Sequence, residues 1–236
     1  MTFIPQSPFA RRTQQFITHN NTTVEETSFQ SNDLLYVSNS TNSNIKLTGT
    51  RCMKIILDSN NDSTITFNVN SITTGFVEVM KCKSSKILLE SNCSHKINTL
   101  QLDAVQDCEI IFNISDENVN NEEFLKSFCS DLSIISNIEC KNVKLIIRNE
   151  NGNALFESIL IFENIEENVL QNNRSSIQFK SKFVKQDETI LLETEVIIRE
   201  GVNGYVSTRK EQQDKDKLQK EFDEKMEKLL KDGLSK

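Results

Sequence analysis

The sequence predicts an all-β fold in which short strands wind into a β-solenoid, or parallel β-helix, followed by a β-hairpin and a terminal α-helix. Three observations support this fold class. From Val24 to about Phe112 the apolar runs are short, rich in Ile, Leu and Val, and separated by polar residues. Such runs, evenly spaced and bounded by turn-forming residues, are typical of a strand repeat. Both prolines lie at the N-terminus, so neither interrupts the backbone hydrogen bonds of the later strands.

The third observation is a cysteine that recurs between two apolar runs. Four cysteines share this setting, at intervals of 30, 26 and 32 residues: Cys52, Cys82, Cys108 and Cys140. In a β-solenoid equivalent positions of successive coils stack on one another, and a small, soft side chain suits an inward-facing bend. We therefore expect a ladder of buried thiols at one bend. Zinc binding would need ligands paired as in Cys-x-x-Cys, which is absent, and redox chemistry is the other alternative.

The strand region has a leader before it and an insertion within it. Residues 1–24 are polar apart from three phenylalanines and predict a disordered leader. Residues 25–200 hold the strand-like runs, and an inserted loop or short helix at 115–128 lengthens the last cysteine interval. Residues 176–200 form two strand-like runs around the polar stretch KQDE. This pattern predicts a hairpin that projects from the end of the solenoid.

The composition changes at residues 201–236, where β-branched runs give way to Glu, Lys and Gln. Apolar residues recur there with helical spacing: Leu218, Phe222, Met226, Leu229 and Leu230. This stripe predicts a charged helical tail. Three turns are few for a coiled coil. The helix is therefore expected either to dock on the body or on a partner, or to stay free and partly formed.

Charge and hydropathy exclude two classes of partner. The chain has 27 basic and 34 acidic residues, a net charge of −7, and no strongly basic block, so it lacks the electrostatic footprint of a nucleic-acid binder. The apolar run at 158–162 is far shorter than the roughly 20 residues that cross a bilayer. The N-terminus has no apolar run of signal-peptide length. We therefore expect a cytoplasmic protein, without a membrane span, whose cysteines are thiols.

Catalytic chemistry has little support in the residue inventory. The chain has only two histidines, His19 in the leader and His95 in a polar turn, and neither stands at a recognisable spacing from a nucleophile. The carboxylates are scattered, and Asp103 and Asp107 fall in an expected solvated bend. The sequence therefore predicts a protein that is not an enzyme and uses no metal or cofactor.

Several segments carry a resemblance to a known family. The motifs are VEVMKCKSSKILLES, KINTLQLDAVQDCEIIF, and IQFKSKF followed by LLETEVI. In this order they resemble the C-terminal β-helix domain of adenylyl cyclase-associated proteins, the C-CAP/cofactor C-like domain, whose superfamily includes tubulin-binding cofactor C. The resemblance covers roughly residues 25–200 and implies a right-handed β-helix. The 115–128 insertion and the helix after residue 204 depart from the family pattern, and residues before Val24 could not supply the domains that precede it in longer members.

The resemblance implies a cytoskeletal function. Domains of this family bind actin monomers, preferentially with ADP, promote their nucleotide exchange without covalent chemistry, and form homodimers by exchanging the terminal hairpin. By this resemblance the hairpin is the dimer arm, with five apolar candidates: Phe179, Phe183, Leu191, Val196 and Ile198. Lys81, Lys83 and Lys86 alternate around Cys82 and are expected to line one outer sheet face. They form either an actin-contact patch or an ordinary solvated face.

Two other functions remain open on the same fold. One is a dimeric interaction scaffold that does not bind actin. The other is GTPase activation of the cofactor C type, in which an inserted arginine stabilises charge on the transferred phosphoryl group. The corresponding stretch, residues 88–102, has no arginine, and Lys96 cannot make a bidentate guanidinium contact. This disfavours GTPase regulation.

Overall fold

The computed structural model describes residues 13–160, 177–198 and 207–234 of the chain. The strands are β1 (Gln14–Ile17), β2 (Thr23–Glu26), β3 (Leu34–Ser38), β4 (Asn44–Gly49), β5 (Lys54–Asp58), β6 (Thr64–Val69), β7 (Phe76–Met80), β8 (Lys86–Leu89), β9 (Thr99–Asp103), β10 (Glu109–Ile114), β11 (Ser133–Asn137), β12 (Lys144–Asn149), β13 (Ala154–Ile159), β14 (Gln178–Gln186), β15 (Thr189–Ile198) and β16 (Ser207–Thr208). The helices are α1 (Ser91–Ser94), α2 (Glu122–Asp131) and α4 (Arg209–Leu234). The chain divides after Thr194 into two compact units.

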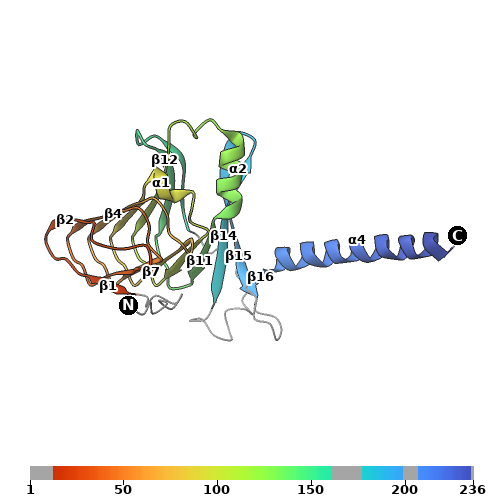
Figure 1. Cartoon of the computed structure of the whole chain (residues 1–236), viewed down its shortest axis with the longest axis horizontal. Coiled ribbons are helices and arrows are strands. Elements are labelled where there is room, and N and C mark those ends of the chain that lie inside the picture. Colours follow the sequence, from red (N-terminus) through yellow and green to blue (C-terminus); the bar gives the residue numbers. More distant parts are fainter. Residues whose placement is uncertain (1–12, 161–176, 199–206, 235–236) are drawn as a thin grey trace, which may run out of the picture. The chain divides into compact units, whose positions relative to one another are not determined.

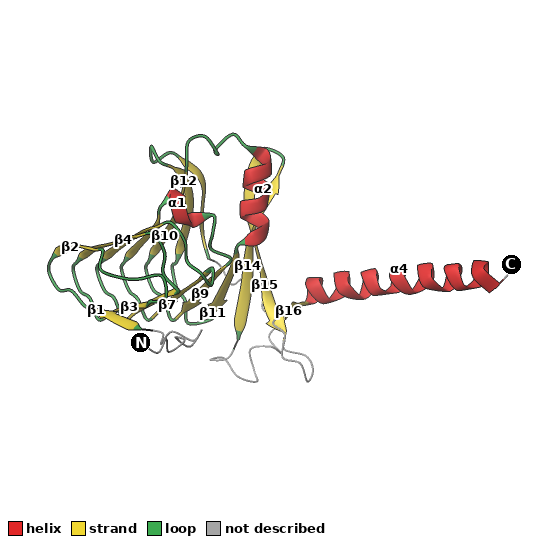
Figure 2. Cartoon of the chain, in the orientation of Figure 1, coloured by secondary structure: helices red, strands yellow, loops and turns green. Residues whose placement is uncertain are grey.

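Successive strands alternate between two sheets, which gives a parallel β-solenoid (Figures 1 and 2). Sheet 1 holds the odd-numbered strands from β1 to β11, and sheet 2 holds the even-numbered strands from β2 to β12. Within each of these sets every neighbouring pair is parallel. Each coil thus adds one strand to each sheet. The expected solenoid is confirmed.

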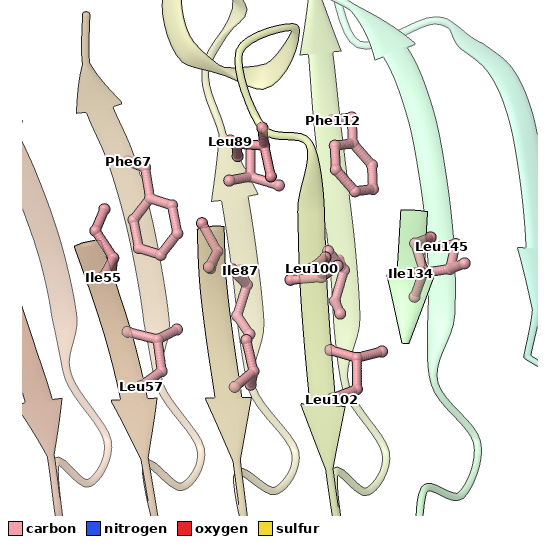
Figure 3. Close-up of a cluster of buried hydrophobic side chains, with 14 of the residues drawn as sticks. Ile55, Leu57, Phe67, Ile87, Leu89, Leu100, Leu102, Phe112, Ile134 and Leu145 are labelled. Carbon is pink, nitrogen blue, oxygen red and sulfur yellow. The ribbon is translucent and has the colours of Figure 1, made fainter. Parts of the chain in front are cut away.

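The core consists of apolar rows that run along the solenoid between the two sheets (Figure 3). One row on sheet 1 contains, in register, Leu35, Ile55, Val77, Leu100 and Ile134. The facing row on sheet 2 contains Ile45, Ile65, Ile87, Ile110 and Leu145. All of these side chains are fully buried. Because side chains alternate along a strand, every second residue enters the core, and each buried Leu or Ile contributes about 1.5–3 kcal/mol.

The two corners of a coil differ in regularity. The tight corner, which leads from a sheet 1 strand to a sheet 2 strand, has nearly constant length, as in residues 39–43, 59–63 and 81–85. Residues in the left-handed region shape it: Asn21, Asn39, Asn42, Ser59, Asp62, Lys81, Ser84, Ala104, Asp107 and Asn142. Asn and Asp tolerate this conformation better than most residues, which accounts for their frequency here. The variable corner leads back to sheet 1 and ranges from residues 50–53 to residues 115–132.

The register corrects the expectation of one thiol ladder. Lys83, Gln106 and Lys141 are bridged in successive tight corners, so the residues before them, Cys82, Val105 and Cys140, occupy equivalent positions. A valine therefore separates the two cysteines. Cys108 lies two residues after Gln106 and is equivalent to Ser85, whereas Cys52 lies in the variable corner, bridged to Ile72. Inward corner positions accept any small side chain, so cysteine spacing does not measure the coil length.

Serine side chains satisfy backbone groups at the tight corner. The hydroxyl oxygens of Ser43, Ser63 and Ser85 accept hydrogen bonds from backbone N–H groups one coil earlier, at Thr22, Ser43 and Ser63. The donor–acceptor distances are 3.5, 3.2 and 3.2 Å. All three serines are buried. Since a buried N–H without an acceptor is costly, this row fixes the spacing of the coils.

The hairpin and the insertion close the C-terminal end of the solenoid. Strands β14 and β15 form the expected hairpin, and β14 pairs antiparallel with β11, in the same chain. The insertion contains helix α2, which packs on β14. The ring of Phe183 contacts three others, Phe112, Phe128 and Phe156, with centroids 5.9, 6.3 and 5.2 Å away. These rings cover the last coil, so the insertion caps the core and does not merely interrupt it.

The solenoid begins earlier in the chain than the sequence indicated. Residues 14–17 and 23–26 are strands β1 and β2, in register with β3 and β4, although β1 and the first half of β2 fall within the expected leader. Residues 1–12 of that leader lie outside the described residues. Phe29 packs against the core in the connection after β2. Its ring lies so close to Gly49 that a Cβ there would meet Phe29 Cε2 at 2.6 Å.

The smaller unit consists of the end of β15, strand β16 and helix α4. β16 pairs antiparallel with β15, with Ser207 opposite Ile198. The helix confirms the expected terminal α-helix. No helix among the described residues is long and apolar enough to cross a membrane.

Candidate partner-binding surface

The three candidate lysines do not lie on one sheet face, which corrects the sequence expectation. Lys81 and Lys83 are exposed in the tight corner between β7 and β8. Lys86 lies on the outer face of sheet 2, where its Nζ is 3.0 Å from Glu109 Oε2. Lys81 adopts a left-handed φ of 51°, so the chain turns there and the strand alternation is lost. Lys81 and Lys83 therefore form a small basic edge, while Lys86 is already paired.

The outer face of sheet 1 carries apolar side chains that sequence reasoning missed. Inward residues alternate with half-buried or exposed outward residues along β1, β3, β5 and β7. The apolar outer face, as we name it, consists of Phe16, Leu34, Tyr36, Ile56, Phe76 and Met80. Phe16, Tyr36 and Ile56 are in register on adjacent strands, and Phe16 is 68% exposed. Partly exposed apolar groups in one patch are typical of a protein-interaction surface.

Charged groups are fixed within this face. Lys54 Nζ lies 2.6 Å from Glu78 Oε2 and 4.3 Å from the centroid of the Phe76 ring. Tyr36 Oη donates to Asp58 Oδ2 at 2.5 Å, and this hydrogen bond is the main cause of the raised pKa of Tyr36. Since these groups are held before any partner arrives, little side-chain entropy is lost on binding. The face therefore offers aromatic surface with preorganised charges.

Doubled apolar residues were the available sequence signal for this face. Leu34 and Leu35 are adjacent, as are Ile55 and Ile56, and in a strand adjacent residues point to opposite sides. One member of each pair must therefore point outward. When each apolar run is interpreted only as a buried strand, the outward-facing residue of each pair is overlooked.

The candidate arm residues have unequal environments. Phe179 and Phe183 in β14 are buried, whereas Leu191 in β15 is 44% exposed. Val196 is half-buried, and the side chain of Ile198 lies outside the described residues. Between the strands, Ser181 Oγ and Thr194 Oγ1 are hydrogen-bonded at 2.8 Å. Phe179 and Phe183 are thus packed inside the single chain, whereas Leu191 is not.

The six cysteines are all free and buried. They include two that sequence reasoning did not single out, Cys93 and Cys129. Burial raises the pKa of all six thiols: to about 12 for Cys52 and Cys93, to about 11 for Cys108 and Cys129, and in the same direction for Cys82 and Cys140. A thiol must ionise to act as a nucleophile or a metal ligand, so we assign these buried side chains a structural role.

The histidines are held in local contacts. His19 Nε2 lies 2.7 Å from Glu26 Oε1, and His95 Nδ1 lies 3.1 Å from the carbonyl oxygen of Ser91. In the part of the chain that the structure describes, no three His, Cys, Asp or Glu side chains are grouped to hold a metal ion. Lys96, in the stretch compared with the GTPase activators, donates from Nζ to the Asn70 carbonyl oxygen at 2.6 Å.

Comparison with known proteins gives no family assignment. No protein-family model matches the chain, and no curated protein matches it either.

Proposed function

We propose that the chain is a binding protein of the cyclase-associated type, which holds an actin monomer against the apolar outer face of sheet 1. The observation that carries this proposal is the fixed group of Lys54, Phe76 and Glu78, which adjoins the in-register row of Phe16, Tyr36 and Ile56. Aromatic and ionic groups mixed in this way favour a protein partner over a small molecule. The choice of actin rests on the motif resemblance.

The proposed activity is binding, with nucleotide exchange as its consequence. A ligand that favours an open form of actin would speed nucleotide release without any chemical step of its own. Lys81 and Lys83 border the end of β7 and would add long-range attraction to an acidic patch on the partner. A role on actin would place the chain in the cytoplasm, associated with the cytoskeleton.

The proposed assembly is a homodimer formed by exchange of the β14–β15 hairpin. In the single chain β14 pairs with β11, and an exchanged hairpin would make the same contacts with β11 of a second copy. Residues 161–176, which join β13 to β14, lie outside the described residues. Sedimentation equilibrium of the isolated protein measures whether this dimer forms.

The actin proposal is tested by sedimentation velocity with ADP-bound actin monomers. We expect a complex at micromolar concentrations, and Ile56→Glu should weaken it about tenfold or more because it places a charge in the apolar outer face. Thr66→Glu, on the outer face of sheet 2, is the matched control and should bind like the wild type. If the wild-type protein does not bind actin monomers, the actin proposal is wrong, and an interaction scaffold on the same fold is the alternative to test next.

A further inference from the structure

Helix α4 carries an apolar stripe that faces solvent. Leu218, Phe222 and Met226 follow one another at intervals of four residues, so they lie on one side of the helix. Their side chains are 66%, 58% and 44% exposed. Three large apolar side chains exposed in a row on one helix mark a surface that another element covers.

The helix does not need a partner in order to form. At its start Thr208 and Glu211 make a capping box: Glu211 N–H donates to Thr208 Oγ1 at 3.2 Å, and Thr208 N–H donates to Glu211 Oε2 at 3.3 Å. Along its length Gln219 Nε2 donates to Asp223 Oδ1, four residues later, at 2.9 Å. Local interactions of this kind stabilise a helix of this length. The stripe is therefore presented on a preformed rod.

The charges of helix α4 indicate which kind of partner covers the apolar stripe. α4 contains equal numbers of basic and acidic side chains, which alternate along it. Amphipathic helices that bind membranes are instead rich in Lys and Arg on their polar side. A helix with balanced charge can satisfy its own charges in a second copy, provided that the two copies run in a direction that brings opposite charges together.

The antiparallel direction does this. Glu221 and Lys225 lie on one flank of the stripe, and Gln219 and Asp223 lie on the other. In an antiparallel pair like flanks meet, so each Glu221 approaches Lys225 of the other copy, and these two attractions outweigh the single approach of one Asp223 to the other. In a parallel pair unlike flanks meet, so Asp223 of one copy approaches both Glu221 and Lys225 of the other, and the repulsion and the attraction offset each other.

We propose that α4 binds α4 of a second copy in an antiparallel pair centred on Phe222. In this register Phe222 contacts Phe222 of the second copy, and Leu218 contacts Met226. The pair is independent of the actin surface and of the hairpin, so it stands or fails separately from the proposed function. It joins chains, or hairpin-exchanged dimers, through their terminal helices.

Cysteine cross-linking of the full chain tests both the pair and its direction. The native cysteines are buried with raised pKa values, so an introduced exposed thiol reacts first under mild oxidation. Phe222→Cys should give a disulfide-linked dimer, and Leu218→Cys alone should not. A mixture of Leu218→Cys and Met226→Cys chains should cross-link. Lys220→Cys, on the opposite side of the helix, is the control for random encounters.

Other outcomes overturn the proposal. Equal cross-linking of Phe222→Cys and Leu218→Cys, without the mixed product, means a parallel pair. Cross-linking no greater than that of Lys220→Cys means that the helices do not pair. As a second measurement, Phe222→Glu should halve the sedimenting mass at a concentration where the wild type is associated. An unchanged mass contradicts the pairing, because this substitution at an exposed helical position does not threaten folding.

Discussion

The backbone N–H of Ser85 donates to the sulfur of Cys108, 3.5 Å away in the next coil. Cys108 thereby takes the place that serine holds in the three preceding coils, where a hydroxyl oxygen accepts the equivalent hydrogen bond. Its own S–H donates to the Gln106 carbonyl oxygen at 3.2 Å. This thiol is a member of a hydrogen-bonded row and acts as a substitute for a hydroxyl.

The substitution Cys108→Ser should therefore be tolerated. Serine supplies the same acceptor and donor in less volume, so we expect the free energy of unfolding to change by about 1 kcal/mol or less. Cys108→Val removes the acceptor and adds one heavy atom to a buried site, and it should cost about 1–3 kcal/mol. Urea unfolding of both variants measures the difference. A more stable valine variant would show that packing outweighs the hydrogen bond here.

The ring of Phe29 makes Gly49 irreplaceable by alanine without a shift of the ring. A Cβ at position 49 would lie 2.6 Å from Phe29 Cε2, so Gly49→Ala should destabilise the solenoid by about 1–3 kcal/mol. In a Phe29→Ala background the same substitution should cost much less. A double-mutant cycle measured by urea unfolding gives the coupling. Additive effects would mean that the ring does not restrict this position.

The aromatic cap of the last coil predicts a large effect at Phe183. Removing its buried ring leaves a cavity beside Phe112, Phe128 and Phe156, so Phe183→Ala should cost about 3–5 kcal/mol of unfolding free energy. Leu191→Ala, in the other strand of the hairpin, is the control. Leu191 is 44% exposed, and its truncation should cost about 0.5 kcal/mol or less. Similar losses at both positions would contradict the capping role.

The buried thiols predict a loss of stability at alkaline pH. An ordinary thiol has a pKa of 9.0, whereas the native pKa of Cys52 and Cys93 is about 12. Above pH 9.0 the unfolded chain loses these protons while the native chain keeps them, so the unfolding free energy falls as pH rises toward 12. Urea midpoints at about pH 8 and about pH 10 measure the fall. In Cys52→Ala the unfolding free energy should fall less over this pH range. A fall equal to that of the wild type would show that Cys52 is not a source of the pH dependence.

The strands were predictable because their cause is local. Alternation of apolar and polar residues, as in Ile65 and Phe67 of β6, determines which side chains enter the core, and this alternation is visible in the sequence. The hairpin and α4 were predictable for the same reason. Each has its own period and its own turn or cap residues.

The coil register was not predictable from the cysteines, since corner positions select for size and not for residue type. Ser85 and Cys108 fill equivalent places, as do Cys82 and Val105. Strand β1 was missed because its four residues include two glutamines and only one buried side chain, that of Ile17. The arrangement of the candidate lysines was not predictable either. The positions of Lys81 and Lys83 depend on backbone turns that no side-chain pattern reveals.

The unequal corners of the solenoid have an evolutionary consequence. At the variable corner the connection can be as short as residues 50–53 or as long as residues 115–132, yet Leu100 and Ile134 on either side of the longest connection remain in register. This edge of the molecule can gain or lose segments without disturbing the strands. The tight corner has no such freedom. Lineages of this fold are therefore expected to diversify in length along one edge, and a designer grafting a new loop would choose the same edge.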